Sequence, residues 1–257
     1  MPKTGHAPVN GLEVYYEIHG TGEPLVLLHG GVIGIMMFGP VVDLLAHSRQ
    51  VIALELQGHG RTPDIDRALT YETMADDVAG VMRHLNIAQA DVMGVSLGGG
   101  VALHVAFRHP EMVRKLVVVA AAFRQNGWYP EVRASFEHMG PATGEPMKQS
   151  PLAKIYPDVD WPTLFAKIGA LQRTKYDWTR DVAAIKSPTM LVFADADAIE
   201  PTHIVEFFGL LGGGKHDAGL DGSKRPVAQL AILPGLTHYT ISAAPALAST
   251  ATGFLGE

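Results

Sequence analysis

The stretch DVMGVSLGGGVALHVAFRHP, residues 91–110, decides the fold class of this chain. Its first five residues form an apolar run of strand length, and the segment after Ser96 reads as a helix that stops before Pro110. A strand that runs directly into a helix requires a sharp turn. Side chains two positions before and after Ser96 would collide in such a turn, and both Gly94 and Gly98 lack one. The pattern predicts a strand–turn–helix unit that presents the Ser96 hydroxyl, with a helix-capping serine as the simpler alternative.

The same alternation of strands and helices extends in both directions along the chain. Asn10-Gly11 is a signal for a type I′ turn, so an antiparallel hairpin is expected at the start. Apolar runs predict further strands at residues 25–28, 51–54, 91–95, 116–120, 190–193 and 229–233. Apolar spacing predicts helices at residues 71–85, 97–109, 201–211 and 243–255. This order predicts an α/β fold with a mostly parallel, eight-stranded sheet that has helices on both faces.

Residues 123–186 interrupt this alternation. The segment has no convincing strand, and it holds all three tryptophans of the chain together with many prolines. We interpret it as a small helical cap, or lid, over the carboxyl edge of the sheet, where open α/β sheets bind ligands. The alternative is an irregular excursion packed against the side of the domain. The expected division is a core domain of residues 1–122 and 187–257 and a cap of residues 123–186.

Composition and charge exclude several classes of function. The formal net charge is −6 and the Lys and Arg residues are scattered, unlike the basic surface of a nucleic-acid-binding protein. The absence of cysteine excludes a thiol nucleophile and a disulfide framework. No signal peptide is visible, and no apolar run approaches the roughly 18 residues of a membrane span. We therefore expect a cytoplasmic protein without nucleic-acid or membrane partners. The oligomeric state stays open, a homodimer included.

A glycine-rich segment at residues 209–225 is expected to be a mobile loop. Its first part, GLLGGGKH, is similar to a phosphate-binding loop but lacks the Ser or Thr that would hold magnesium. It also follows a predicted helix rather than a strand. We therefore set a nucleotide site aside.

The residues around Ser96 match the motif G-x-S-x-G, which holds a serine for nucleophilic attack. Four blocks follow one another along the chain: LVLLHGG at 25–31, LELQGHGRT at 54–62, GVSLGG at 94–99, and FADADAIEP at 193–201 followed by PGLTH at 234–238. In this combination and order the chain resembles the α/β-hydrolase family over nearly its whole length, the insertion excepted. The resemblance implies the α/β-hydrolase fold and a catalytic triad in the order Ser, Asp, His.

The family order places the acid and the base after the nucleophile. His238 follows the last predicted strand and is the expected base, because neutral imidazole can accept the serine proton. The family pattern G-x-x-D-x-x-x-P fits residues 194–201 with Asp197 as the acid, although alanine replaces its first glycine. Asp195 is the alternative acid. Either carboxylate could instead cap the helix that follows.

By the same resemblance, the backbone N–H groups of Gly31 and Leu97 form the oxyanion hole. His29 is expected to be structural and hydrogen-bonded beneath the site. Further side chains are expected around the substrate: Val32, Met37, Phe123, Trp128, Trp161 and Tyr239. We expect no metal site and no cofactor.

The resemblance implies a serine hydrolase that cleaves carboxylic esters of a small molecule, lactones and thioesters included, through an acyl-enzyme. Serine rather than aspartate at position 96 argues against the dehalogenase and epoxide-hydrolase branches, which need a carboxylate nucleophile. Perhydrolysis, as in cofactor-free haloperoxidases, and hydrolysis of a carbon–carbon bond are open alternatives on the same triad. A low-turnover ligand receptor and a structural member with an inactive site are alternatives of another class.

Overall fold

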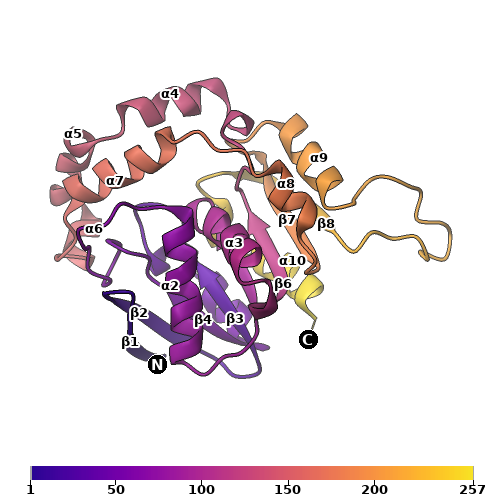
Figure 1. Cartoon of the computed structure of the whole chain (residues 1–257), viewed down its shortest axis with the longest axis horizontal. Helices are drawn as coiled ribbons and strands as arrows, with labels where there is room; N and C mark the ends of the chain where they lie inside the picture. Colours follow the sequence, from indigo (N-terminus) through magenta and orange to yellow (C-terminus); the bar gives the residue numbers. More distant parts are fainter. Residues whose placement is uncertain (1, 257) are drawn as a thin grey trace.

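The computed structural model describes residues 2–256 and is built on one eight-stranded sheet with the order β1-β2-β4-β3-β5-β6-β7-β8 (Figure 1). Its strands are β1 (Lys3–Val9), β2 (Leu12–His19), β3 (Glu23–Leu28), β4 (Arg49–Leu54), β5 (Ala90–Val95), β6 (Val113–Val119), β7 (Thr189–Ala196) and β8 (Gln229–Thr237). β2 is antiparallel to both of its neighbours, and β3 to β8 are parallel to one another. The predicted mostly parallel α/β sheet is confirmed.

The first hairpin has the turn that its sequence predicts. Asn10 and Gly11 both adopt positive φ angles, 50° and 82°, as a type I′ turn requires. Several strands are longer than the apolar runs that predicted them. β6, for example, begins at Val113, and its first residues include the partly exposed Arg114 and Lys115. The apolar runs identified the buried parts of the strands and missed their exposed ends.

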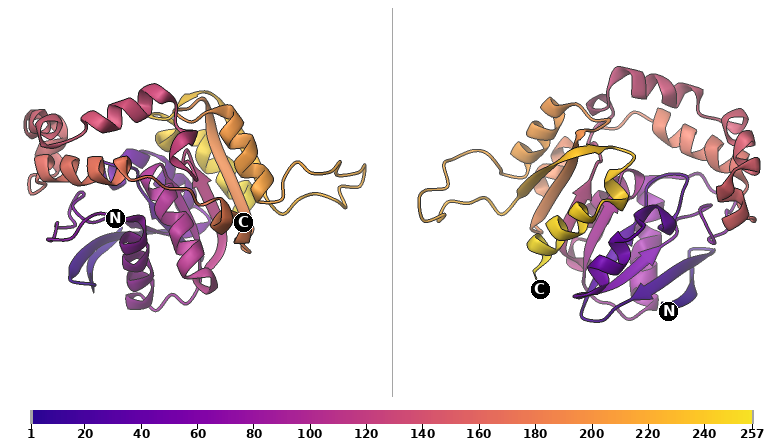
Figure 2. Two further views of the ribbon diagram at one scale, coloured as in Figure 1. Left: turned by 45° about the horizontal axis from the view of Figure 1, so that its top comes forward. Right: turned by 180° about the vertical axis from the view of Figure 1, so that it is seen from behind.

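Helices cover both faces of the sheet, and the strands alternate between two hydrophobic cores. In β3, Leu25 and Leu27 pack in the core beneath α1 (Val41–Ala46) and α10 (Pro245–Leu255), which Figure 2 shows from behind. Val26 and Leu28 point the other way, into the core that includes α2 (Tyr71–His84) and α3 (Leu97–Arg108). Burial on both faces explains why the parallel strands are continuous apolar runs.

The segment between β6 and β7 consists mainly of helices. They are α4 (Pro130–His138), α5 (Pro141–Gly144), α6 (Pro151–Ile155), α7 (Trp161–Arg173) and α8 (Thr179–Ala184). The helices α4, α5 and α7 arch over one end of the sheet, whereas α8 packs against α3 and α9 (Pro201–Leu210) (Figure 1). The helices α4 to α7 each have a proline in the first turn. The prolines of this segment therefore start helices, because the first turn needs no N–H donor there.

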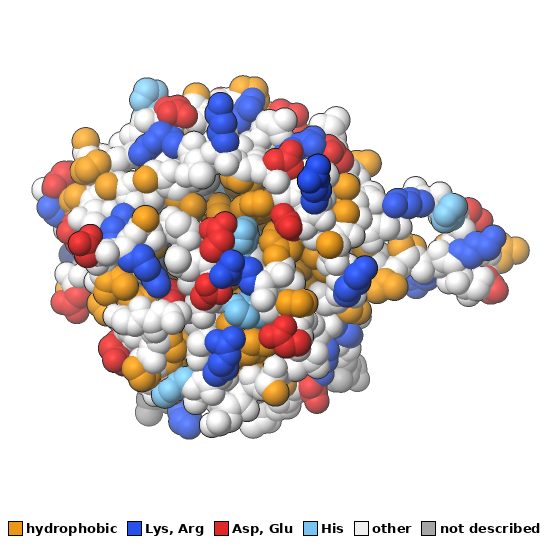
Figure 3. Space-filling view, viewed as in Figure 1, with side chains coloured by type: hydrophobic (Ala, Val, Ile, Leu, Met, Phe, Trp, Pro, Cys, Tyr) orange, Lys and Arg blue, Asp and Glu red, His pale blue; other side chains and the backbone are white. Residues whose placement is uncertain are grey.

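The connection between α9 and β8, residues 211–228, projects from the body of the molecule (Figures 1 and 2). It carries the fully exposed Leu220 and side chains of both charges. Acidic and basic side chains are also intermixed over the face drawn in Figure 3. Across residues 2–256, no helix is both long enough and apolar enough for a transmembrane segment.

Three buried histidines make the stability of this fold depend on pH. Burial lowers the pKa of His29 from 6.5 to about 3, and the neighbouring His59 lowers it further. Burial also lowers the pKa of His59 and of His203 to about 4. The unfolded chain therefore binds more protons than the folded chain between about pH 4 and pH 6.5, and the folded state loses stability as the pH falls through this range.

We expect the free energy of unfolding to be constant above about pH 6.5 and to fall by about 1.4 kcal/mol per pH unit for each of these histidines below it. Urea denaturation between pH 7 and pH 4.5 measures this slope. The variant His203→Gln should reduce it by about one proton, since a glutamine cannot be protonated. A free energy of unfolding that is unchanged between pH 7 and pH 5 would contradict the assignment.

Candidate active site

Ser96 occupies the turn between β5 and α3, at the carboxyl end of the central strands. Its backbone has φ 54° and ψ −114°, a region that residues with a Cβ rarely adopt. The Ser96 N–H donates to the Val119 carbonyl of β6 at 2.9 Å, which helps to hold the turn against the sheet. Such a conformation costs about 1–3 kcal/mol and persists only where the surroundings impose it.

Close backbone packing explains the glycines on either side of this turn. A Cβ at position 94 would lie 2.0 Å from the Gly98 carbonyl oxygen. A Cβ at position 98 would lie 2.4 Å from the carbonyl oxygen of Leu28 in β3. Any side chain at either position would force the strand and the helix apart. The spacing seen in the sequence therefore reflects the contact between β5, α3 and β3.

His238 and Asp197 reach Ser96 from the loops that follow β8 and β7. The Ser96 hydroxyl lies 3.1 Å from Nε2 of His238, and Nδ1 of His238 lies 2.9 Å from Oδ1 of Asp197. The Asp197 side chain is 1% exposed and the His238 side chain 10%. Since a carboxylate only accepts, Nδ1 carries the proton, which leaves the Nε2 lone pair for the serine hydroxyl. The three side chains form one chain of hydrogen bonds.

Backbone N–H groups hold Asp197 in place. Ala198 donates to Oδ1 at 2.8 Å and Ala194 donates to Oδ2 at 3.1 Å, in addition to the bond with His238. The carboxylate is therefore buried with hydrogen bonds to both of its oxygens, as a buried charge requires. This arrangement fixes the direction from which it meets the imidazole.

Asp195, the alternative acid, has a different position. It accepts hydrogen bonds from the N–H groups of Gly235 and Leu236, at 2.9 and 3.2 Å. The hydrogen bond from the Gly235 N–H is the main cause that holds the pKa of the Asp195 carboxyl below its ordinary value. The side chain makes no hydrogen bond to His238, but it ties β7 to the end of β8, directly before His238. The two aspartates of the motif therefore have separate tasks.

The N–H groups of Gly31 and Leu97 are available beside Ser96. Leu97 is the first residue of α3, so its N–H has no acceptor within the helix. The N–H of Gly31 has no hydrogen-bond acceptor among residues 2–256. Both residues line the same pocket as Ser96. The two N–H groups therefore lie where both can donate to an oxygen atom bound next to Ser96.

His29 supports this loop from below. Its ring is completely buried; Nε2 accepts from the Leu56 N–H at 3.0 Å and Nδ1 donates to the Gly30 carbonyl at 2.6 Å. Because burial lowers its pKa to about 3, the ring stays neutral and keeps one tautomer. His29 thus positions the loop that carries Gly31.

A pocket of about 330 Å³ opens onto Ser96 between the core and the helices α4 and α7. Its walls include Gly30, Gly31, Val32, Ile33, Met37, Val95, Ser96, Leu97, Trp128, Val132, Ser135, Phe136, Met139, Ile168, Gln172, Ala198, His238, Tyr239, Ser242 and Ala243. Four of the side chains expected around the substrate, Val32, Met37, Trp128 and Tyr239, are among them.

Phe123 and Trp161 were also expected around the substrate, but neither lines this pocket. Phe123 is fully buried and stacks on the ring of His203, with 4.1 Å between the ring centroids. Trp161 is 2% exposed and packs into the hydrophobic core at the start of α7. Phe123 therefore packs against α9 and Trp161 against the hydrophobic core, and neither ring faces this pocket.

Sequence reasoning missed the walls that α4 and α7 contribute. Val132, Ser135, Phe136 and Met139 follow a helical spacing of three and four residues along and just beyond α4. Ile168 and Gln172 repeat this spacing on α7. A search of the insertion for helical faces instead of aromatic residues would have found them.

Trp128 connects this roof to the loops that carry Asp197 and His238. Its ring lies 5.3 Å from the His238 ring, edge to face, and its Nε1–H donates to the Tyr176 hydroxyl at 2.9 Å. Trp128 also forms a β-bridge with Ile199, and the Tyr129 N–H donates to the Ala198 carbonyl at 3.1 Å. The beginning of α4 is therefore fastened to the loop that carries Asp197.

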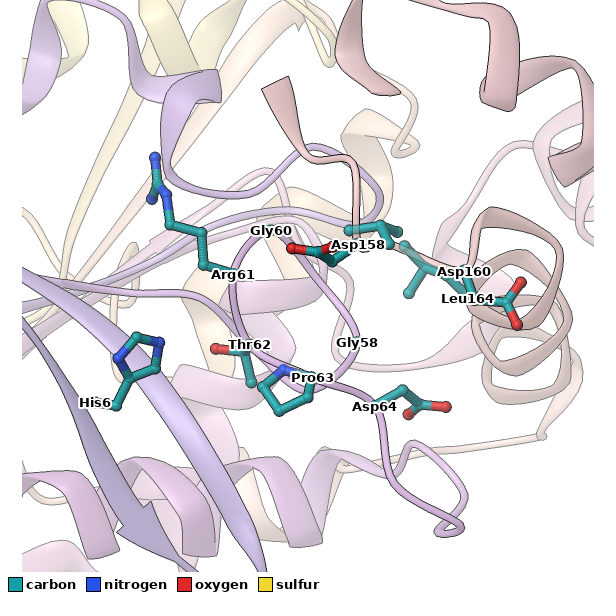
Figure 4. A pocket seen from close by; sticks show the side chains of 11 residues that line it. His6, Gly58, Gly60, Arg61, Thr62, Pro63, Asp64, Asp158, Asp160 and Leu164 are labelled. Carbon is teal, nitrogen blue, oxygen red and sulfur yellow. The ribbon is translucent and has the colours of Figure 1, made fainter. Parts of the chain in front are cut away.

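A second, larger cavity of about 630 Å³ lies between residues 58–64 and the start of α7 (Figure 4). Most of its charged side chains already have partners, Asp158 excepted. Asp160 caps α7 through Thr163, and Asp64 pairs with Lys167 at 2.6 Å. We assign it no chemistry. Within residues 2–256, no group of three His, Asp or Glu side chains converges to hold a metal ion.

Because the backbone at position 96 is strained, we expect a glycine there to give a more stable protein than an alanine. Ser96→Gly should raise the free energy of unfolding by about 1 kcal/mol relative to Ser96→Ala, because glycine tolerates this backbone conformation and alanine does not. Both variants lack the hydroxyl, so Ser96→Ala is the matched control. Urea denaturation measures the difference, and equal stability of the two variants would contradict the strain.

The two aspartates can be separated by the rate at which a fluorophosphonate labels Ser96. Asp197→Ala should slow labelling by about 10³–10⁴-fold, because the imidazole loses the partner that orients it. The variant Asp195→Ala should slow labelling by only about 10–100-fold, because the change loosens the end of β8 before His238 but removes no contact of the His238 ring. A larger effect at Asp195 than at Asp197 would reverse the assignment.

Comparison with known proteins places this geometry in a family. The family described as "alpha/beta hydrolase fold" matches residues 23–157. The 2-hydroxymuconate semialdehyde hydrolase of Pseudomonas sp. (strain CF600) is 37% identical over 132 residues, which are 46% of this chain and 47% of that protein. A putative non-heme haloperoxidase of Mycobacterium phage D29 is 35% identical over 117 residues, 45% of this chain and 42% of that protein.

The matches to these curated relatives span about half of their length. Among solved structures, the enol-lactonase from Burkholderia xenovorans LB400 superposes with a TM-score of 0.74 at 25% identity. That superposition covers 98% of this chain and 100% of the enol-lactonase. From the matched family, the sheet order and the turn at Ser96, we conclude that the chain belongs to the α/β-hydrolase fold family.

Proposed function

We propose that this chain is a serine hydrolase of carboxylic esters, with Ser96 as nucleophile, His238 as base and Asp197 as the acid that orients the base. The observation that carries the proposal is the continuous chain of hydrogen bonds from the Ser96 hydroxyl through both ring nitrogens of His238 to Asp197. A helix-capping role does not account for it, since the Ser96 side chain makes no capping hydrogen bond to α3.

In the proposed reaction, His238 Nε2 takes the hydroxyl proton while Ser96 Oγ forms a bond to the ester carbonyl carbon. The carbonyl oxygen becomes an oxyanion that accepts hydrogen bonds from the N–H groups of Gly31 and Leu97. The bond to the alcohol oxygen then breaks, and the imidazolium gives its proton to the leaving alcohol. Water, deprotonated by His238, attacks the acyl-enzyme and releases the carboxylic acid and the free serine.

The residues 123–186 form the cap of this enzyme, and residues 1–122 and 187–257 form its core. The first residues of the segment lie beside residues 176–178, shortly before its end, and this supports the division. The Gln125 N–H donates to the Tyr176 carbonyl at 3.1 Å, and the Trp178 N–H donates to the Phe123 carbonyl at 2.9 Å. A segment that leaves and rejoins the core at one place can be an insertion that covers the pocket.

Hydrolysis of a carbon–carbon bond is the second candidate. It is favoured by the 37% identity, over about half of the chain, with a relative named as a 2-hydroxymuconate semialdehyde hydrolase. The same serine, base and backbone donors can serve both reactions. The two are separated by the substrate, so p-nitrophenyl esters and a vinylogous 1,5-diketone should be assayed in parallel.

Ser96→Ala should lower hydrolysis of a p-nitrophenyl ester by at least about 10⁴-fold, because no other group can form the acyl-enzyme. A fluorophosphonate probe, followed by peptide mapping, should label the wild-type protein at Ser96 and leave this variant unlabelled. The thermal unfolding of the variant should match that of the wild type, since its backbone and Cβ are unchanged. An active Ser96→Ala variant would refute the mechanism.

A further inference from the structure

The pocket above Ser96 has a consistent chemical character. None of the side chains that line it is Lys, Arg, Asp or Glu, and its titratable groups are His238 and Tyr239. Most of its wall is aliphatic, aromatic or methionine. The Asp197 carboxylate directly behind His238 adds a negative charge to this environment. An anionic substrate would therefore lose its hydration without gaining a cationic partner.

Gln172 is the exception in the apolar roof. It lies on α7, one turn after Ile168, and both residues line the pocket. The residue is only 8% exposed, yet its side-chain amide makes no hydrogen bond to any group of residues 2–256. Its amide nitrogen and oxygen are not sealed from solvent, so the amide can exchange bound water for a hydrogen-bonding group of a ligand. Here the free amide borders the cavity.

The surroundings hold Gln172 in position without using its side chain. The Gln125 Nε2 donates to the backbone carbonyl of Gln172 at 3.1 Å. The next residue, Arg173, donates to the carbonyls of Phe136 and Met139 at 3.1 and 2.8 Å, and these bonds fasten α7 to α4. The guanidinium of Arg173 is thus occupied outside the pocket, and the amide of Gln172 is the polar group that α7 presents to a ligand.

We propose that Gln172 determines substrate specificity by binding an uncharged polar group of the substrate, and that the pocket selects neutral esters over carboxylate-bearing ones. The group would be a carbonyl, ester, amide or hydroxyl, each of which can pair with an amide. This inference rests on the proposed ester hydrolysis at Ser96. The cavity of about 330 Å³ limits the substrate to a small molecule.

The test uses p-nitrophenyl esters of equal length with three acyl ends: an alkyl chain, a methyl ester and a free carboxylate. A second series varies the alcohol in the same way and is followed by pH-stat. In at least one of the two series, the substrate with the methyl-ester end should have the highest kcat/KM of the three. In both, the carboxylate end should be at least about 100-fold poorer than the neutral ends, because it enters without a counter-charge.

Substitutions at position 172 assign this preference to the amide. Gln172→Met, similar in shape but unable to pair, should lower kcat/KM for the methyl-ester end about 10-fold and leave the alkyl ester unchanged. Gln172→Lys should raise activity on the carboxylate end relative to the wild type. The matched control is Gln149→Met, the same change at an exposed glutamine of the segment that does not line this pocket. It should keep the wild-type order of substrates.

Labelling of Ser96 by a fluorophosphonate separates the two possible failures. If Ser96 is labelled and the carboxylate-ended esters react as fast as the neutral ones, the proposed role of Gln172 is overturned and the serine hydrolase stands. The proposed role of Gln172 is also overturned, and the serine hydrolase still stands, if Gln172→Met lowers kcat/KM equally for the alkyl and methyl-ester substrates. If Ser96 is not labelled and no ester is cleaved, the proposed function fails and the specificity inference with it.

Discussion

The turn at Ser96 is held in a strained backbone conformation by the packing of α3 against β5 and β3, and the candidate site depends on this contact. Position 98 lies so close to the Leu28 carbonyl that only glycine fits, and position 94 is equally close to Gly98. The same contact brings the Ser96 hydroxyl out of the sheet and begins α3 with an unpaired N–H at Leu97. One packing constraint therefore supplies both the candidate nucleophile and one candidate oxyanion donor.

The parallel sheet brings the other groups to the same edge. β7 and β8 are neighbours whose carboxyl ends lie side by side, so the loops after them meet, although Asp197 and His238 are distant in sequence. In the loop after β7, Asp197 contacts the imidazole, while Asp195 at the end of β7 accepts from the Gly235 and Leu236 N–H groups at the end of β8. The first carboxylate orients the ring and the second positions the loop that carries it.

The helices between β6 and β7 form one wall of the pocket above Ser96. They contribute an apolar roof from α4 and α7, and Trp128 fastens this roof to the loop after β7. The roof contains a single amide, Gln172, whose side chain has no partner among residues 2–256. The core thus supplies the three side chains of the candidate triad, and the insertion supplies the apolar roof and the amide of the pocket.

The hairpin at Asn10-Gly11, the strand–turn–helix around Ser96 and the succession of strands and helices could be read from the sequence, because backbone geometry and apolar periodicity are local properties. The sequence also pointed to Ser96, His238 and Asp197 as candidate site residues, with Asp195 left open. The folded structure was needed to show that Asp197 rather than Asp195 contacts His238, that Phe123 and Trp161 pack in the core, and that Gln172 lines the pocket. Each of these outcomes depends on which distant segment packs against a side chain, and composition and spacing carry no record of that partner.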